Sequence, residues 1–141
     1  MSETTIRLAE YFYIQTPDRP GEAARVLSSL KDAGVNLLAF SAFPTGRRSQ
    51  MDFIPEDPAV FRAAAKNAGW KLTGPKKVFL LTGEDRVGAM AELATRVAAA
   101  KINITATQAV APGSGRFGAL LWVEPRNVKR AAQALGISDS R

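Results

Sequence analysis

The chain has 141 residues, of which 46% are hydrophobic and 23% are charged, a composition typical of folded globular proteins and not of disordered ones. It has no cysteine and no histidine, which excludes disulfides, thiol nucleophiles, imidazole bases and nearly all zinc or copper sites. Its formal net charge of +6 favours anionic partners, either small ligands or nucleic acid, without deciding between them.

The sequence also shows no pattern typical of a signal peptide, of a membrane-spanning segment or of a metal site. The N-terminal residues show no basic stretch followed by an apolar run, as a signal peptide would, and no apolar segment approaches the roughly 18 residues of a membrane span. The carboxylates form no spaced cluster that would hold a metal ion. We therefore expect a soluble, cytoplasmic protein with no cofactor, no metal and no membrane partner.

The first half of the chain predicts the order strand, helix, strand, strand, helix, strand. Aromatic residues indicate the first strand, and apolar residues at helical spacing indicate the first helix, which Gly34 ends. Asp57 is expected as the N-cap of the second helix, with Pro58 as its first residue. The strands are predicted at residues 8–16, 35–43, 48–54 and 70–72, and the helices around residues 23–30 and 58–68.

The second half repeats this order after a linker of Gly, Pro and Lys at residues 73–77. The final residues, 136–141, are too few and too polar to promise a closing strand, so the second unit is expected to keep one free sheet edge. The other strands are predicted at residues 78–82, 102–111 and 116–123, and the helices at residues 88–100 and 126–135.

The repeated order predicts an α+β fold of two ferredoxin-like βαββαβ units, at residues 6–74 and 75–141, each an antiparallel sheet with its helices on one face. The last strand of the second unit is expected to be short or absent. Units of this size have marginal cores, so we expect them to bury surface against each other or against a second copy of the chain. Because unpaired strand edges favour pairing between copies, the sequence predicts a homodimer.

One polar turn occurs twice, where the first strand of each unit passes into its first helix. Asp18-Arg19-Pro20-Gly21 recurs as Asp85-Arg86-Val87-Gly88, and Asn36-Leu37 recurs as Asn103-Ile104, each 67 residues later. A helix N-terminus offers N–H groups to a carboxylate, an aspartate suits an ammonium group, and an asparagine both donates and accepts. An amino acid would satisfy all three. The glycines would let it approach closely, and the arginines are candidates for pairing with an acidic group.

Each of these residues also has an ordinary structural interpretation. Aspartate before a helix is commonly a cap or turn residue, asparagine after a helix is commonly a turn residue, and arginine commonly points to solvent. A turn that forms the fold would be duplicated as readily as a site. Because Pro20 stiffens the first turn and Val87 leaves the second looser, the first repeat is favoured as the better-formed site.

With these motifs the chain resembles a tandem ACT-domain protein, whose pattern is a strand, a D-x-P-G turn, a helix, and N-[IVL] opening the second strand. The first repeat matches fully, and the second departs only at Val87. The resemblance covers residues 8–137. It implies a regulatory, non-catalytic protein that binds a small amino acid or related metabolite, often at the interface between two ACT units. The resemblance assigns ligand binding to Asp18, Gly21 and Asn36, and to Asp85, Gly88 and Asn103. The other predicted binding residues belong to the same two motifs and are Arg19, Pro20, Leu37, Arg86 and Ile104.

No catalytic domain is expected in these two repeats, so the chain is expected either to bind an enzyme or a transporter in trans or to sense a metabolite by itself. A ligand-free scaffold module of the same fold remains an alternative. A third is an RNA-binding module, but aligning Phe117-Gly118 with its third-strand motif puts Ala119 where a base-stacking aromatic should lie, which argues against nucleic acid. Enzymatic activity is not expected, because no serine or threonine has a histidine base and no carboxylate pair repeats at a strand end.

Two basic pairs have no role in this scheme. Arg47-Arg48 is expected at a hairpin tip and Lys76-Lys77 in the linker. Such pairs are most often solvated charge, and the functional alternative is a patch for an anion or a partner.

Overall fold

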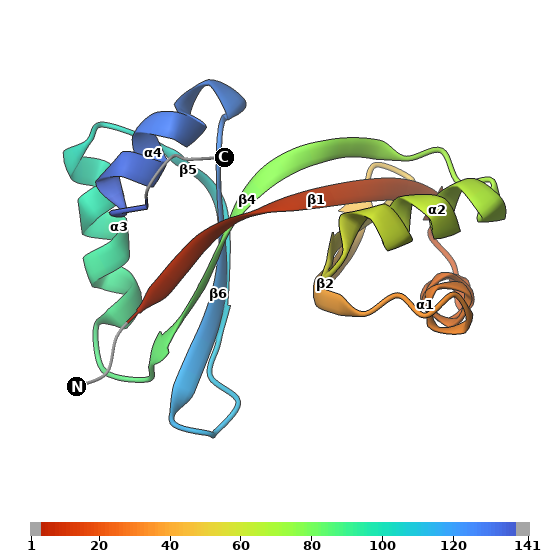
Figure 1. Ribbon diagram of the computed structural model, residues 1–141, viewed down its shortest axis with the longest axis horizontal. Helices are drawn as coiled ribbons and strands as arrows, with labels where there is room; N and C mark the ends of the chain where they lie inside the picture. The colour runs from red at the N-terminus through yellow and green to blue at the C-terminus, as the bar shows by residue number, and fades with distance from the viewer. Residues whose placement is uncertain (1–3, 138–141) are drawn as a thin grey trace. The chain divides into compact units, whose positions relative to one another are not determined.

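The computed structural model describes residues 4–137, and the order of its helices and strands follows the predicted repeat (Figure 1). The prediction is wrong at the middle of the chain: residues 70–72 are not a strand, and the expected linker at residues 73–77 is the first part of one long strand, Thr73–Glu84. The α+β class with two ferredoxin-like repeats is confirmed. Of the polar tail, residues 138–141 lie outside the described part. The elements are β1 (Thr5–Pro17), α1 (Glu22–Asp32), β2 (Leu37–Thr45), β3 (Arg48–Pro55), α2 (Pro58–Ala68), β4 (Thr73–Glu84), α3 (Ala89–Ala99), β5 (Ile104–Val110), β6 (Arg116–Val123), the 3-10 turn η1 (Pro125–Asn127) and α4 (Val128–Ala134).

The chain divides into two compact units. The N-terminal unit is Glu10–Lys76, and the C-terminal unit takes the residues from Lys77 onward together with the residues up to Ala9. The six strands are hydrogen-bonded in the order β2-β3-β1-β4-β6-β5. Two long strands, β1 and β4, therefore each contribute one part to the N-terminal unit and another to the C-terminal unit.

The start of β1 completes the C-terminal unit, and the expectation of a free edge beside β4 is wrong. Within this unit the order is β5-β6-β4-β1, so residues 5–9 of β1 take the place beside β4 where a closing strand would otherwise pair. Ile6 and Leu8 pack against the core of this unit, while Arg7 between them is exposed. This alternation is what a strand with one buried face requires.

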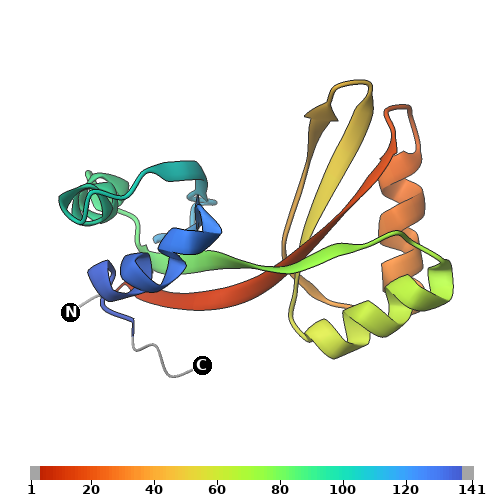
Figure 2. The same ribbon diagram turned by 90° about the horizontal axis from the view of Figure 1, so that it is seen from above.

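The core of the N-terminal unit lies between one face of its strands and the helices α1 and α2, which lie on the same side (Figure 2). Antiparallel register pairs Phe12 with Phe53 and Ile14 with Met51. The ring of Phe61, from α2, lies 5.1 Å from that of Phe12 and 5.2 Å from that of Phe53, measured between centroids. Such aromatic pairs contribute about 0.5–1.5 kcal/mol beyond their buried area.

The C-terminal unit repeats this arrangement with smaller side chains. Phe79 of β4 lies opposite Leu121 of β6, and Leu81 lies opposite Ala119. Both helices of the unit, α3 and α4, contribute to the same buried cluster. Their buried members are Leu93, Val97, Ala131 and Ala132.

We expect Leu8→Ala to destabilise the C-terminal unit by about 1–3 kcal/mol, because it removes a partly buried side chain from that core. Urea unfolding followed by the fluorescence of Trp122 in β6 would measure the change, in a Trp70→Phe background that removes the other tryptophan. Arg7→Ala is the matched control, since Arg7 is exposed and should change stability by less than about 0.5 kcal/mol. Equal effects of the two variants would contradict the assignment of this strand.

Candidate functional site

Both repeated turns end on a glycine that begins a helix. Gly21 is the N-cap of α1 with φ of 90°, and Gly88 is the N-cap of α3 with φ of 83°. This left-handed conformation strongly favours glycine. A Cβ built on either glycine would meet no atom within 4 Å among the described residues, so the backbone conformation, and not close packing, accounts for the glycine.

The glycine caps leave the starts of α1 and α3 without a capping side chain. By contrast, α2 is capped as the sequence predicted: the Asp57 carboxylate accepts hydrogen bonds from the N–H groups of Ala59 at 3.0 Å and Val60 at 3.4 Å. The first turn of a helix has N–H groups with no partner inside the helix, and a nearby anion satisfies them. Asp18 and Asp85, which were possible helix caps from the sequence, are therefore not the N-cap residues of α1 and α3.

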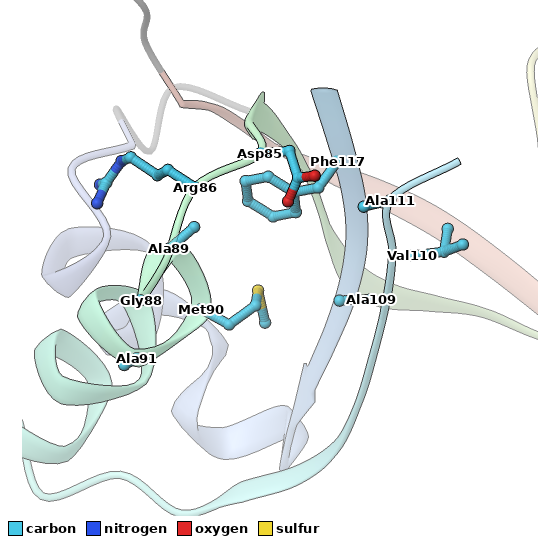
Figure 3. Close-up of a pocket in the computed structure, with 10 residues that line it drawn as sticks. All are labelled: Asp85, Arg86, Gly88, Ala89, Met90, Ala91, Ala109, Val110, Ala111 and Phe117. Carbon is cyan, nitrogen blue, oxygen red and sulfur yellow. The ribbon is translucent and has the colours of Figure 1, made fainter. Parts of the chain in front are cut away.

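A pocket of about 350 Å³ lies at the repeated turn of the C-terminal unit, between the start of α3 and the end of β5 (Figure 3). The side chain of Met90 and the ring of Phe117 extend into this space, and the Asp85 carboxylate lies beside that ring. Ala89 and Ala109 line it with small apolar surface. We call this the α3 corner pocket; it combines an apolar floor, one carboxylate and an uncapped helix start.

The walls of the α3 corner pocket are fixed by the fold. The N–H of Asp85 donates to the carbonyl of Gly115 at 3.0 Å, which ties the turn to the loop between β5 and β6. Phe117 is only 5% exposed because it belongs to the core of the unit. The backbone of Asp85 and the apolar floor are thus held by contacts within the unit.

Arg86, in the turn, is bound to a carboxylate of the helix that follows it, α3. Its Nη1 lies 2.7 Å from Glu92 Oε2, and its Nη2 lies 2.6 Å from Glu92 Oε1. This two-bond pair lowers the pKa of Glu92 and raises the pKa of Arg86. In Figure 3 the guanidinium extends away from Met90 and Phe117. Arg86 therefore lines the rim of the pocket without pointing into it.

The asparagines lie at the opposite ends of their helices from the turns. Asn103 follows α3, whose 11 residues span about 16 Å at 1.5 Å per residue. The N–H of neighbouring Ile102 donates to Val97 at the helix end, and the carbonyl of Asn36 accepts from the Glu56 N–H at 2.9 Å. The asparagine stands at the start of the strand that follows the helix, and the aspartate stands in the turn that precedes the helix. Within one unit the length of the helix therefore separates the two residues. Leu37 and Ile104 pack against the cores of their units.

At the N-terminal unit's turn, a carboxylate of the protein occupies the start of the helix. Glu22 is the first residue of α1, and its side chain is 8% exposed. It accepts hydrogen bonds from Arg25 Nη2 at 2.6 Å and Arg19 Nε at 2.9 Å, and these bonds lower its pKa. Asp18 and Pro20 beside it are exposed.

The two turns differ most at one pair of equivalent positions. Glu22 corresponds to Ala89 at the same 67-residue offset that relates the two motifs. The N-terminal turn therefore has a carboxylate where the α3 corner pocket has a methyl group. The prediction that the N-terminal turn is the better-formed site depended on Pro20. It did not take into account the exchange of Glu22 for Ala89, which is visible when the two repeats are aligned.

Residues 4–137 contain neither a cluster of metal-ligating side chains nor a helix that could span a membrane. This part of the chain has no group of three or more acidic side chains that could hold a metal ion. None of its helices combines the length and the apolar character needed to cross a membrane.

No protein-family model and no curated protein matches this sequence. Several solved structures are similar. Protein BT0572 from Bacteroides thetaiotaomicron has a TM-score of 0.80 at 17% identity, over 92% of this chain and 88% of that one. The regulatory subunit of aspartate kinase from Thermus thermophilus has a TM-score of 0.63 at 19% identity, over 94% and 93%. The regulatory subunit of aspartate kinase from Thermus flavus has a TM-score of 0.59 at 20% identity, over 95% of this chain and 94% of that one. The likeness establishes an ACT-like fold.

We expect Glu22→Gln to lower the melting temperature at pH 7, because a carboxylate with a lowered pKa stabilises the folded state when it is ionised. This stabilisation is complete at a pH above the pKa of a glutamate in the unfolded chain, about 4.3. It is lost as the pH falls through the lower pKa that Glu22 has in the folded protein. The gap between the variant and the parent should therefore close at acid pH. Glu92→Gln is the control: its side chain is 61% exposed, so its effect should be smaller. A gap that persists in acid would contradict this role of the Glu22 charge.

Proposed function

We propose that this protein is a non-catalytic regulatory protein that binds a small amino acid with an apolar side chain in the α3 corner pocket. The observation that carries the proposal is the combination found there: an uncapped helix start, the Asp85 carboxylate and the apolar surface of Met90 and Phe117. An amino acid presents the three matching groups. The fold similarity to regulatory subunits of aspartate kinase supports a regulatory role.

Each group of the ligand has a partner in this arrangement. The ligand carboxylate faces the N–H groups of the first turn of α3, where the helix dipole is positive. Its ammonium group pairs with Asp85 in a charge-assisted hydrogen bond. Its side chain packs on Met90 and Phe117. The volume of about 350 Å³ lies at the small end of the range of small-molecule sites.

The N-terminal turn keeps the fold and supplies its own anion. Glu22 already gives the start of α1 a carboxylate, neutralised by Arg19 and Arg25. A ligand carboxylate there would compete with Glu22 for the same helix start and for the same two arginines. We therefore assign ligand binding to Asp85 and Gly88, and assign Asp18 and Gly21 to the structural form of the same turn.

The proposed regulation depends on the two elements, α3 and β5, that a bound ligand would connect. A bound amino acid would link the start of α3 to the end of β5 and so favour one arrangement of the two. Val87 and Val110 lie at this corner and are both exposed. An enzyme or transporter that contacts these valines would respond to the bound state, which is the requirement for coupling between two sites. Without a ligand, the same surface serves the alternative function of a scaffold.

We expect at least one apolar amino acid to bind when the twenty are titrated calorimetrically at millimolar concentration. Asp85→Asn should weaken binding about tenfold or more, because it removes the charge that pairs with the ammonium group. Ala89→Glu should abolish it by placing a carboxylate at the start of α3, as Glu22 does at α1.

Asp18→Asn is the matched control for Asp85→Asn, since it makes the same change in the other turn. It should leave the affinity unchanged. Loss of binding in Asp18→Asn and not in Asp85→Asn would contradict the assignment, and no heat from any amino acid would favour the scaffold.

We also propose a homodimer. The edge strands of the sheet are β2 and β5, and β5 is exposed along almost all of its length. Exposed edges with unpaired backbone groups pair readily with a second chain. Size-exclusion chromatography with light scattering at micromolar concentration should give twice the chain mass of 15.1 kDa. A clean monomer would contradict the proposal.

A further inference from the structure

A second pocket lies in the N-terminal unit, on the face of its strands opposite to the helices. Phe12 and Ile14 of β1 enter the core, so Tyr13 and Gln15 between them lie on the other face. Register places Gln15 opposite Gln50 and Pro17 opposite Arg48 on β3. Because facing residues share a side of the sheet, Arg48 lies on the face of Tyr13 and Gln15.

The pocket has a volume of about 410 Å³ and is lined by Tyr13, Gln15, Arg48, Lys71 and Thr73. Two of these residues are cations, two carry hydroxyl groups and one carries an amide. None is a carboxylate. Every one of the five side chains can donate a hydrogen bond. We call this the β1 face pocket.

The cations of the β1 face pocket are positioned by contacts within the unit. Arg48 Nη2 donates to the carbonyl of Gln15 at 3.1 Å, which fixes the guanidinium at the pocket and uses one of its five N–H groups. Lys76 Nζ lies 5.6 Å from the centroid of the Tyr13 ring. It adds a third positive charge next to the pocket.

One carboxylate lies near enough to oppose these charges. Asp52 is opposite Tyr13 in the register, and it accepts a hydrogen bond from Gln50 Nε2 at 2.9 Å. It is 8% exposed, and burial raises its pKa. Its charge offsets that of Lys76 in part, which leaves Arg48 and Lys71 as the excess positive charge at the pocket.

We propose that the β1 face pocket binds a small organic anion with two or more negative charges, carried on phosphate or carboxylate oxygens. Arg48 offers a planar fork that suits two anionic oxygens at once, and Lys71 offers a point charge. The hydroxyl groups of Tyr13 and Thr73 and the amide of Gln15 supply directed hydrogen bonds. The volume falls within the range of metabolite sites. The pocket's chemistry differs from that of the α3 corner pocket, so the proposal does not rest on the proposed function.

The test is calorimetric titration of the full chain at low salt with three probes: glycerol phosphate, succinate and inorganic pyrophosphate. We expect saturable binding of at least one probe, weakened by added salt because the cations are exposed. Tighter binding of the phosphate ester or of the dicarboxylate would identify which anionic group the pocket prefers, and either result supports the proposal.

Substitutions locate the binding. Arg48→Ala and Lys71→Ala should each weaken it about tenfold, while circular dichroism shows the fold unchanged. Arg47→Ala is the matched control, because Arg47 is the neighbouring cation of the same hairpin and is not among the lining residues described. Lys71→Ala keeps the test valid if Arg48→Ala fails to fold. Equal binding in all the variants would overturn the proposal, as would failure of every probe while single-stranded RNA binds.

Discussion

The conformation of one residue, Gly88, sets the conditions at the proposed site. Its left-handed backbone turns the chain from β4 into α3, and a glycine in this position has no side chain with which to cap the helix. The first turn of α3, which lines the α3 corner pocket, therefore has no capping side chain from its N-cap residue. The core places Phe117 beside this helix start, and the hydrogen bond to Gly115 places the backbone of Asp85 there.

The duplicated turn shows two solutions to the same electrostatic problem. At α1 the chain supplies its own carboxylate, Glu22, and neutralises it with two arginines. At α3 the equivalent residue is Ala89, and the acidic residue of the first turn, Glu92, is paired with Arg86, whose guanidinium extends away from the pocket. Two units of one fold therefore have different chemistry at the same corner, and on this difference we base the proposal that only the α3 corner binds a ligand.

The repeat, the fold class and the Asp57 cap were predictable because each depends on local residue patterns. The closing strand of the C-terminal unit was not, since its residues stand at the other end of the chain and pairing leaves no local signal. The motif also did not show that, within one unit, the crossover helix separates Asn103 from Asp85 by its whole length. Arg47-Arg48 was recognised as a possible anion patch, but only the strand register brings Arg48 to Tyr13.

The central claim is that the ligand binds at the start of α3, and methionine methyl groups report on it directly. The chain has three methionines, of which Met90 lines the α3 corner pocket and Met51 lies in the core of the N-terminal unit. With ¹³C-methyl methionine, titration of the amino acid that binds should shift the Met90 methyl resonance and leave that of Met51 in place. A shift of Met51 with Met90 unmoved would contradict the account.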